Sequence, residues 1–89
     1  MALVLGVRLG EVVDIGEDWI AAWSIDGAHS ATIMTSQGGR VRITARQLRE
    51  VFPLVYVGLS PTSARNLRLV FSAPRSIAIC RRRRLEGPS

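Results

Sequence analysis

Residues 2–27 read ALVLGVRLGEVVDIGEDWIAAWSIDG. Three apolar runs in this stretch have the length and β-branched content of strands, at 2–7, 12–15 and 19–25. The segments between them, among them Gly16-Glu17-Asp18, and the closing Asp26-Gly27 are turn signals, because glycine accepts a positive φ and aspartate bonds its own backbone. The stretch therefore predicts a β-meander and sets a mainly β fold class for the chain.

The rest of the chain contains further strand-like runs and one segment with a helical pattern. We expect a hairpin and three later strands, at 31–35 with 40–43, and at 54–57, 67–71 and 77–80. Thr44 and Gln47 have the spacing of a helix capping box, and apolar residues follow on one helical stripe: Leu48, Val51 and Phe52. The sequence therefore predicts a short α-helix near 45–52, and it shows no repeat at a fixed period.

The charge of the chain is unevenly distributed. The net charge is +5, and all 12 basic residues are arginines. Residues 1–39 hold one arginine and five acidic residues, whereas residues 40–89 hold eleven arginines and two acidic residues. A planar guanidinium grips phosphate through two hydrogen bonds and stacks on bases. The pattern favours a nucleic-acid partner, and the alternative is a solvated basic surface without a specific ligand.

Size and composition exclude several classes of protein. A chain of 89 residues with 47% hydrophobic content predicts one domain, and its small core favours an oligomer. No apolar run approaches a membrane span, and we expect neither a secretory signal nor a membrane partner, so the predicted location is cytoplasmic. One cysteine and one histidine argue against disulfides and a zinc site. No nucleophile with a base and no paired acids occur, so we expect neither an enzyme nor a cofactor.

Two blocks of sequence carry a family resemblance. The first, 3–18, contains the turns Arg8-Leu9-Gly10-Glu11 and Ile15-Gly16-Glu17-Asp18. The second, 67–81, contains Arg68, the turn Ala73-Pro74-Arg75 and a final Arg81. In this order they resemble the carbon storage regulator family of bacterial RNA-binding proteins, called CsrA or RsmA. The resemblance covers residues 3–27 and 66–81.

The resemblance implies a fold and a function. The implied fold is an intertwined β-sandwich homodimer with five core strands per chain, in which the first strand of one chain lies beside the fifth of the other. The implied partners are messenger RNA and regulatory small RNA, bound at GGA-containing single-stranded or loop segments on two equivalent sites. Such binding controls translation and message stability. A protein antagonist is a further expected partner.

The resemblance also assigns residues to the RNA interface. By position, and by extension along the basic run, six residues are expected to bind RNA: Leu5, Arg8, Arg68, Arg81, Arg82 and Arg83. Arg81 is expected to form a bidentate hydrogen bond with guanine or phosphate, whereas Arg82 and Arg83 would add affinity through counterion release.

Each assignment has a structural alternative. Arg8 would pair with Glu11, Arg68 would pair with an acidic residue on a neighbouring strand, and the terminal arginines would form a basic tail. Trp19 and Trp23 are expected to pack in a core or a dimer contact rather than to stack on bases.

The sequence departs from the family in its middle and at its end. Residues 28–65 have no counterpart and are expected to form an insertion, whose helix near 45–52 would replace the family's carboxy-terminal helix in packing. Residues 1–84 are then a single CsrA-like domain, and 85–89 a flexible tail.

The departures also support other functions. Val7 stands where the family has arginine and Val70 where it has glycine, which leaves GGA specificity open. The alternative function is therefore a CsrA-like protein-binding module that has lost specific RNA readout. A third possible function is that of a DNA-binding or purely structural β-domain.

Overall fold

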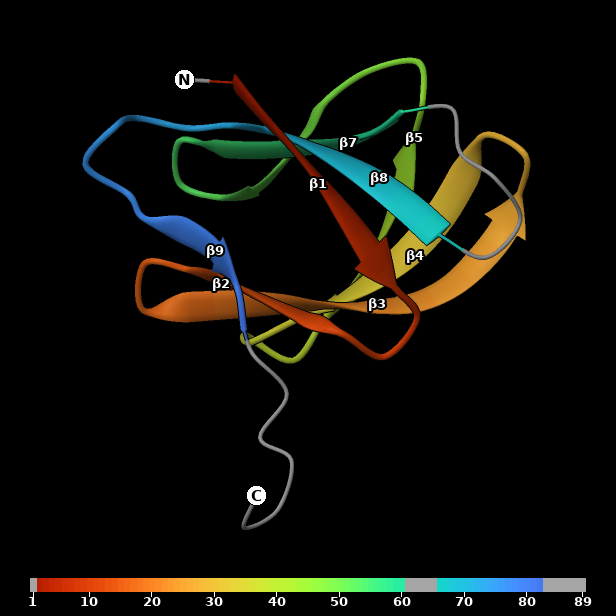
Figure 1. The fold of residues 1–89 in the computed structure, drawn as a ribbon, viewed down its shortest axis with the longest axis horizontal. Helices are drawn as coiled ribbons and strands as arrows, with labels where there is room; N and C mark the ends of the chain where they lie inside the picture. Colours follow the sequence, from red (N-terminus) through yellow and green to blue (C-terminus); the bar gives the residue numbers. More distant parts are fainter. Residues whose placement is uncertain (1, 61–65, 83–89) are drawn as a thin grey trace, which may run out of the picture.

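The computed structural model describes residues 2–60 and 66–82, and every regular element in these ranges is a β-strand. There are nine such strands: β1 (Ala2–Arg8), β2 (Val12–Ile15), β3 (Asp18–Gly27), β4 (Ser30–Thr35), β5 (Arg40–Thr44), β6 (Arg49–Phe52), β7 (Val55–Ser60), β8 (Asn66–Ser72) and β9 (Ile79–Arg81). Figure 1 shows their arrangement. The predicted mainly β class is confirmed. None of the described residues forms a helix with the length and apolar character needed to cross a membrane.

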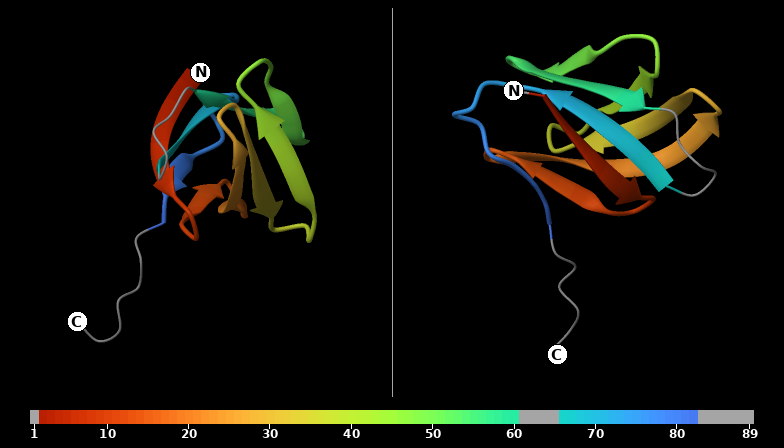
Figure 2. Two further views of the ribbon diagram at one scale, coloured as in Figure 1. Left: turned by 90° about the vertical axis from the view of Figure 1, so that its right-hand side faces the viewer. Right: turned by 45° about the horizontal axis from the view of Figure 1, so that its top comes forward.

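The strands form two antiparallel sheets that share one hydrophobic core. Sheet A has the order β1-β8-β7-β6, and sheet B has the order β5-β4-β3-β2-β9. Figure 2 shows the sheets as two layers. Because side chains alternate along a strand, Leu67, Leu69 and Phe71 of β8 are fully buried, while Arg68 between them is exposed. Sheet B contributes fully buried side chains to the same core, including Val13, Ile20, Ile33 and Ile43.

The helix predicted near 45–52 is wrong. Residues 45–48 bend over sheet A instead, and residues Arg49–Phe52 form β6, which pairs antiparallel with β7. Leu48 lies over the backbone of Gly58, where an added Cβ would stand 2.7 Å from the Leu48 Cδ2. Pairing with β7 places Phe52 in the core opposite Val55 and satisfies the backbone of this segment through the sheet. Tertiary pairing therefore overrides the local helical pattern, and no helix takes the packing role that was expected of it.

The two halves of the described chain have the same strand arrangement. β1 lies beside β8 in sheet A, as β5 lies beside β4 in sheet B. Leu5 faces Leu69 in the first pair, and Val41 faces Ile33 in the second. The shift is 36 residues for both strands (41 − 5 and 69 − 33), so the registers coincide. Strands β1–β4 and β5–β8 are thus related by an approximate internal two-fold axis.

The internal two-fold changes the fold that the resemblance implied. That fold exchanges strands between two chains of five strands each, whereas here β1 and β5 are exchanged between two halves of one chain with nine described strands. The expectation of five core strands per chain is therefore wrong, and homodimerisation stays a prediction. β9 falls outside the symmetry, since it pairs with β2 while the equivalent strand β6 has no described strand on its outer side.

Candidate nucleic-acid interface

A polar recess of about 400 Å³ lies where an edge of sheet A meets an edge of sheet B. β1 is the edge strand of sheet A on this side, and β9 is the edge strand of sheet B. The lining combines three arginines (Arg8, Arg68 and Arg81), the carboxylate of Glu11 and two residues of β1, Gly6 and Val7. The structure thus brings together Arg8, Arg68 and Arg81 of the residues predicted from sequence.

Arg81 joins the two edges. β9 pairs with β2, and Arg81 faces Val13 in that pairing. Its guanidinium Nη1 donates a hydrogen bond of 3.0 Å to the carbonyl oxygen of Gly6 on β1. A Cβ added to Gly6 would meet no atom within 4 Å, so the face of β1 is open at this residue. The first and the last described strand, β1 and β9, therefore meet within a single molecule, one residue from Leu5.

The turn after β1 fixes the position of Arg8. The Arg8 backbone N–H donates to the Glu11 Oε1 at 2.7 Å, and the Glu11 N–H donates to the Arg8 carbonyl at 3.0 Å. Gly10 occupies this turn with a φ of 89°, a value that favours glycine. Because Glu11 caps the backbone of Arg8, the carboxylate holds the turn rather than the Arg8 guanidinium.

The recess has an excess of positive charge. Arg68 is exposed on β8, directly across from Gly6, because its neighbours on the strand face the core. In the part of the chain that the structure describes, ion pairs join only Arg42 with Asp26 and Arg82 with Asp14. The expected pairings of Arg8 with Glu11 and of Arg68 with an acidic neighbour are therefore not formed there, and three guanidiniums face one carboxylate.

Arg82 has a different environment from Arg81. Its guanidinium binds the Asp14 carboxylate of β2, with the Nη2 at 2.6 Å from Oδ1. The hydrogen bond from Arg82 lowers the pKa of Asp14 below its ordinary value and raises that of Arg82. The Arg82 N–H also donates to the Val12 carbonyl, which continues the pairing of β9 with β2. Arg82 is thus held on sheet B and does not line the recess.

The other two predicted residues stand apart from the recess. The Leu5 side chain is half-buried and packs against the hydrophobic core, opposite Leu69. A contact with RNA at this position would involve the backbone of β1 rather than the side chain. Arg83 lies outside the described residues.

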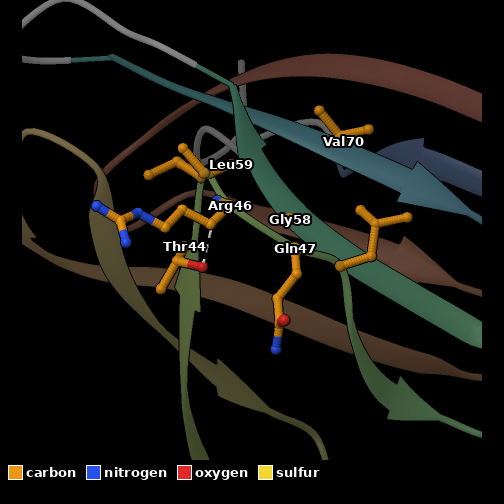
Figure 3. A pocket seen from close by; sticks show the side chains of 8 residues that line it. Thr44, Arg46, Gln47, Gly58, Leu59 and Val70 are labelled. Carbon is orange, nitrogen blue, oxygen red and sulfur yellow. Dashed lines mark hydrogen bonds between the residues drawn. The ribbon is translucent and has the colours of Figure 1, made fainter.

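Two further surface features lie outside the recess. Trp23 is 49% exposed, so of the two expected roles a place in the core is wrong, and a dimer contact stays a prediction. Arg40 lies 4.5 Å from the Trp23 ring centroid. A second hollow, of about 220 Å³, lies between the β5–β6 connection and sheet A. Figure 3 shows its lining, with Thr44 beside Arg46 and with Gly58, Leu59 and Val70 on the sheet. Arg46 is its only charged lining residue, so the hollow offers little for a charged ligand.

Two elements of the recess were not predicted from the sequence as site residues. Glu11 positions the turn, and Gly6, which has no side chain of its own, supplies the carbonyl that accepts a hydrogen bond from Arg81. Glu11 belongs to the Arg-x-Gly-Glu turn that carries the family resemblance, so that motif was a signal for it.

Comparisons with family models, with curated proteins and with solved structures find no match for this chain.

Proposed function

We propose that this protein is a bacterial post-transcriptional regulator, acting in the cytoplasm, that binds GGA-containing single-stranded or loop segments of messenger RNA or small RNA. Through this binding it controls translation and message stability. The observation that carries the proposal is the Arg81 guanidinium on the Gly6 carbonyl, in a recess with two further arginines that have no described carboxylate partner.

The chemistry of the recess suits an unstacked RNA segment. A strand edge offers N–H and C=O groups that can read base edges, and single-stranded RNA exposes those edges. Arg81 donates one N–H to the Gly6 carbonyl, and the other N–H groups of its guanidinium remain for guanine O6 and N7 or for a phosphate. Arg68 lies across from Gly6 on β8, and Arg8 lies two residues further along β1; both supply positive charge for the backbone of the RNA.

The test is a fluorescence-anisotropy titration of a GGA stem-loop and of its CCA counterpart at two salt concentrations. Arg81→Ala should weaken GGA binding by about 1–3 kcal/mol if the arginine reads a base. The matched control is Arg75→Ala, which removes the same charge from an exposed turn outside the recess. The Arg75→Ala variant should lose only the RNA affinity that removal of any one positive charge would cost. Equal losses for the two variants would contradict the assignment of Arg81.

A second variant separates blocked access from lost charge. Gly6→Leu adds a side chain where nothing lies within 4 Å of the added Cβ, so the fold should tolerate it while the recess is filled. We expect it to abolish the preference for GGA over CCA. Absence of RNA binding by the wild-type protein even at low salt would refute the proposal and favour the protein-binding alternative.

A further inference from the structure

Two tryptophans of β3 lie on the outer face of sheet B, the side that points away from the core. Ile20 and Ala22 are buried, so Trp19 and Ala21, which alternate with them, point to the outer face. Trp23 follows at the shift in register between β3 and β4, and it is 49% exposed. The two indoles therefore flank a small alanine on one face of the sheet.

A row of paired residues crosses this face from one edge of the sheet to the other. Ala21 pairs with Val12 of β2 on one side and with Met34 of β4 on the other. Met34 pairs with Arg40 of β5, and the Arg82 N–H donates to the Val12 carbonyl at 2.9 Å. Because neighbouring strands are about 4.8 Å apart, the row places Arg82 and Arg40 about 19 Å apart. The face thus has an apolar middle with an arginine at each end.

Arg40 lies over the exposed indole. Its guanidinium carbon is 4.5 Å from the Trp23 ring centroid, which is the geometry of a cation–π contact. Within residues 2–60 and 66–82, Arg40 belongs to no ion pair. Unstacked RNA bases pack on aromatic rings and on guanidinium planes alike. The pair of Trp23 and Arg40 therefore offers a stacking surface to a base and a positive charge to its phosphate.

The other charges of this face also favour a polyanion. Arg82 binds Asp14, and the Arg42 Nε of β5 lies 3.7 Å from the Asp26 Oδ2, so these two arginines are locally compensated. The Arg42 carbonyl accepts a hydrogen bond of 3.3 Å from the Arg49 Nη1, which brings a further guanidinium to the β5 edge. A neutral ligand such as a sugar would use the indoles but not the arginines, whereas single-stranded RNA uses both.

β9 joins this face to the recess. Arg81 lines the recess and donates to the Gly6 carbonyl, whereas Arg82, the next residue, binds Asp14 on the outer face. β9 is also the edge strand of sheet B, beside β2 (Figure 1). The two surfaces therefore meet at β9, and an RNA bound at Arg81 reaches the outer face by crossing a single strand.

We propose that the outer face of sheet B is a stacking surface for single-stranded RNA, on which the nucleotides that flank the segment held at Arg81 pack against Trp19 and the Trp23–Arg40 pair. The inference rests on the proposed function and extends the RNA contact beyond the GGA segment. Because every base has a π-face, this surface adds affinity without adding sequence preference. Arg40 and Arg82 supply positive charge for the phosphates at the two ends of the row.

Anisotropy titrations with a short and an extended RNA test this surface. The short RNA is a GGA oligoribonucleotide that fills only the recess, and the extended RNA adds about six unpaired pyrimidines, at the 5′ or the 3′ end in separate molecules. The wild type should bind one of the extended RNAs on the order of tenfold more tightly than the short one. Trp23→Ala and Arg40→Ala should lose most of this gain but bind the short RNA like the wild type. Trp23→Phe should keep most of the gain, because a phenyl ring still stacks.

Tyr56→Ala is the matched control. Tyr56 is 38% exposed on the outer face of sheet A, between the buried residues Val55 and Val57, so its loss should leave the gain unchanged. The chain has two tryptophans, so Trp19→Phe and Trp23→Phe each leave one indole as a reporter. The extended RNA should quench the fluorescence of either indole, and the short RNA should not. A circular-dichroism melt of each variant confirms that it is folded.

The outcomes separate this inference from the proposed function. Equal affinity of the wild type for the short and the extended RNAs would overturn the stacking surface and leave the Arg81 recess intact. A gain that Trp23→Ala and Arg40→Ala both retain would overturn it as well. A pyrimidine strand without GGA that binds as tightly as the extended RNA, and needs Trp23 to do so, would support the surface and overturn the proposed function. Absence of binding to every one of these RNAs at low salt would overturn both.

Discussion

The register of β8 decides which of its side chains line the recess, and truncation of Leu69 tests that register. Leu69 is fully buried between Leu5 of β1 and Leu59 of β7. Its neighbour Arg68 points to the opposite, solvent side and lines the recess. Because side chains alternate with a period of two, a slip of one residue would exchange the two environments. The pair Leu69→Ala and Arg68→Ala therefore separates a core role from an interface role at adjacent positions.

The expected magnitudes differ widely. Truncating a fully buried leucine to alanine costs about 2–5 kcal/mol, and a central position in sheet A argues for about 3 kcal/mol. A domain of 89 residues has a free energy of unfolding of about 4–13 kcal/mol, so this loss is a large fraction of the total. It corresponds to a fall in Tm of roughly 12–24 °C. Arg68→Ala should change the free energy of unfolding by no more than about 0.5 kcal/mol.

Urea unfolding followed by tryptophan fluorescence measures the free energy of unfolding of both variants, and we expect both to show the same slope m. Anisotropy at a temperature where both are folded then measures RNA binding. We expect Leu69→Ala to be destabilised but to bind RNA like the wild type, and Arg68→Ala to be stable but to bind more weakly. A loss of stability below about 1 kcal/mol for Leu69→Ala, or equal losses for the two, would refute the register and with it the outward placement of Arg68.

Two further predictions concern a turn and the acid range of pH. Leu54 has a φ of 66° and is 62% exposed, so Leu54→Gly should raise the free energy of unfolding in urea by about 0.5–1 kcal/mol. Leu9→Gly, at an exposed position without positive φ, should lower it instead. The hydrogen bond from Arg82 lowers the folded pKa of Asp14 from 3.8, so its stabilising contribution is full above pH 3.8 and is lost as the pH falls below that value. Acid titrations of Asp14→Asn and wild type should therefore converge at low pH, and a constant difference would contradict the pairing.

Most strands were predictable because their burial pattern is local. The apolar runs at 2–7, 12–15 and 19–25 became β1, β2 and β3 with ends shifted by no more than two residues. The segment 45–52 was predicted wrongly because its stripe of Leu48, Val51 and Phe52 suits a helix as well as a strand. The choice between them depends on β7, which offers a free edge that only the folded chain provides.

The internal two-fold was hidden because the two halves share little sequence at equivalent positions, although their strands begin 36–38 residues apart (66 − 30 to 40 − 2). Leu9-x-Glu11-Val12 and Leu48-x-Glu50-Val51 share a pattern 39 residues apart (48 − 9), whereas the paired strands are shifted by 36.

The interface was predicted in part. Arg8, Arg68 and Arg81 gather at one recess, as the two sequence blocks suggested. Arg82 looks equivalent to Arg81 in a run of arginines, but successive side chains of a strand point to opposite sides, and Arg82 meets Asp14. The contact between Arg49 and Arg42 depends on the relation between the two halves and could not be seen in the sequence alone.

The pairing of β1 with β8 also constrains how the chain is made. During synthesis on the ribosome, the apolar segment Ala2–Arg8 emerges well before its hydrogen-bonding partner Asn66–Ser72. The outer edge of β2 likewise stays unpaired until β9 has been synthesised. Such distant pairings make folding slow, and β1 stays open to aggregation or chaperone capture until β8 has been synthesised.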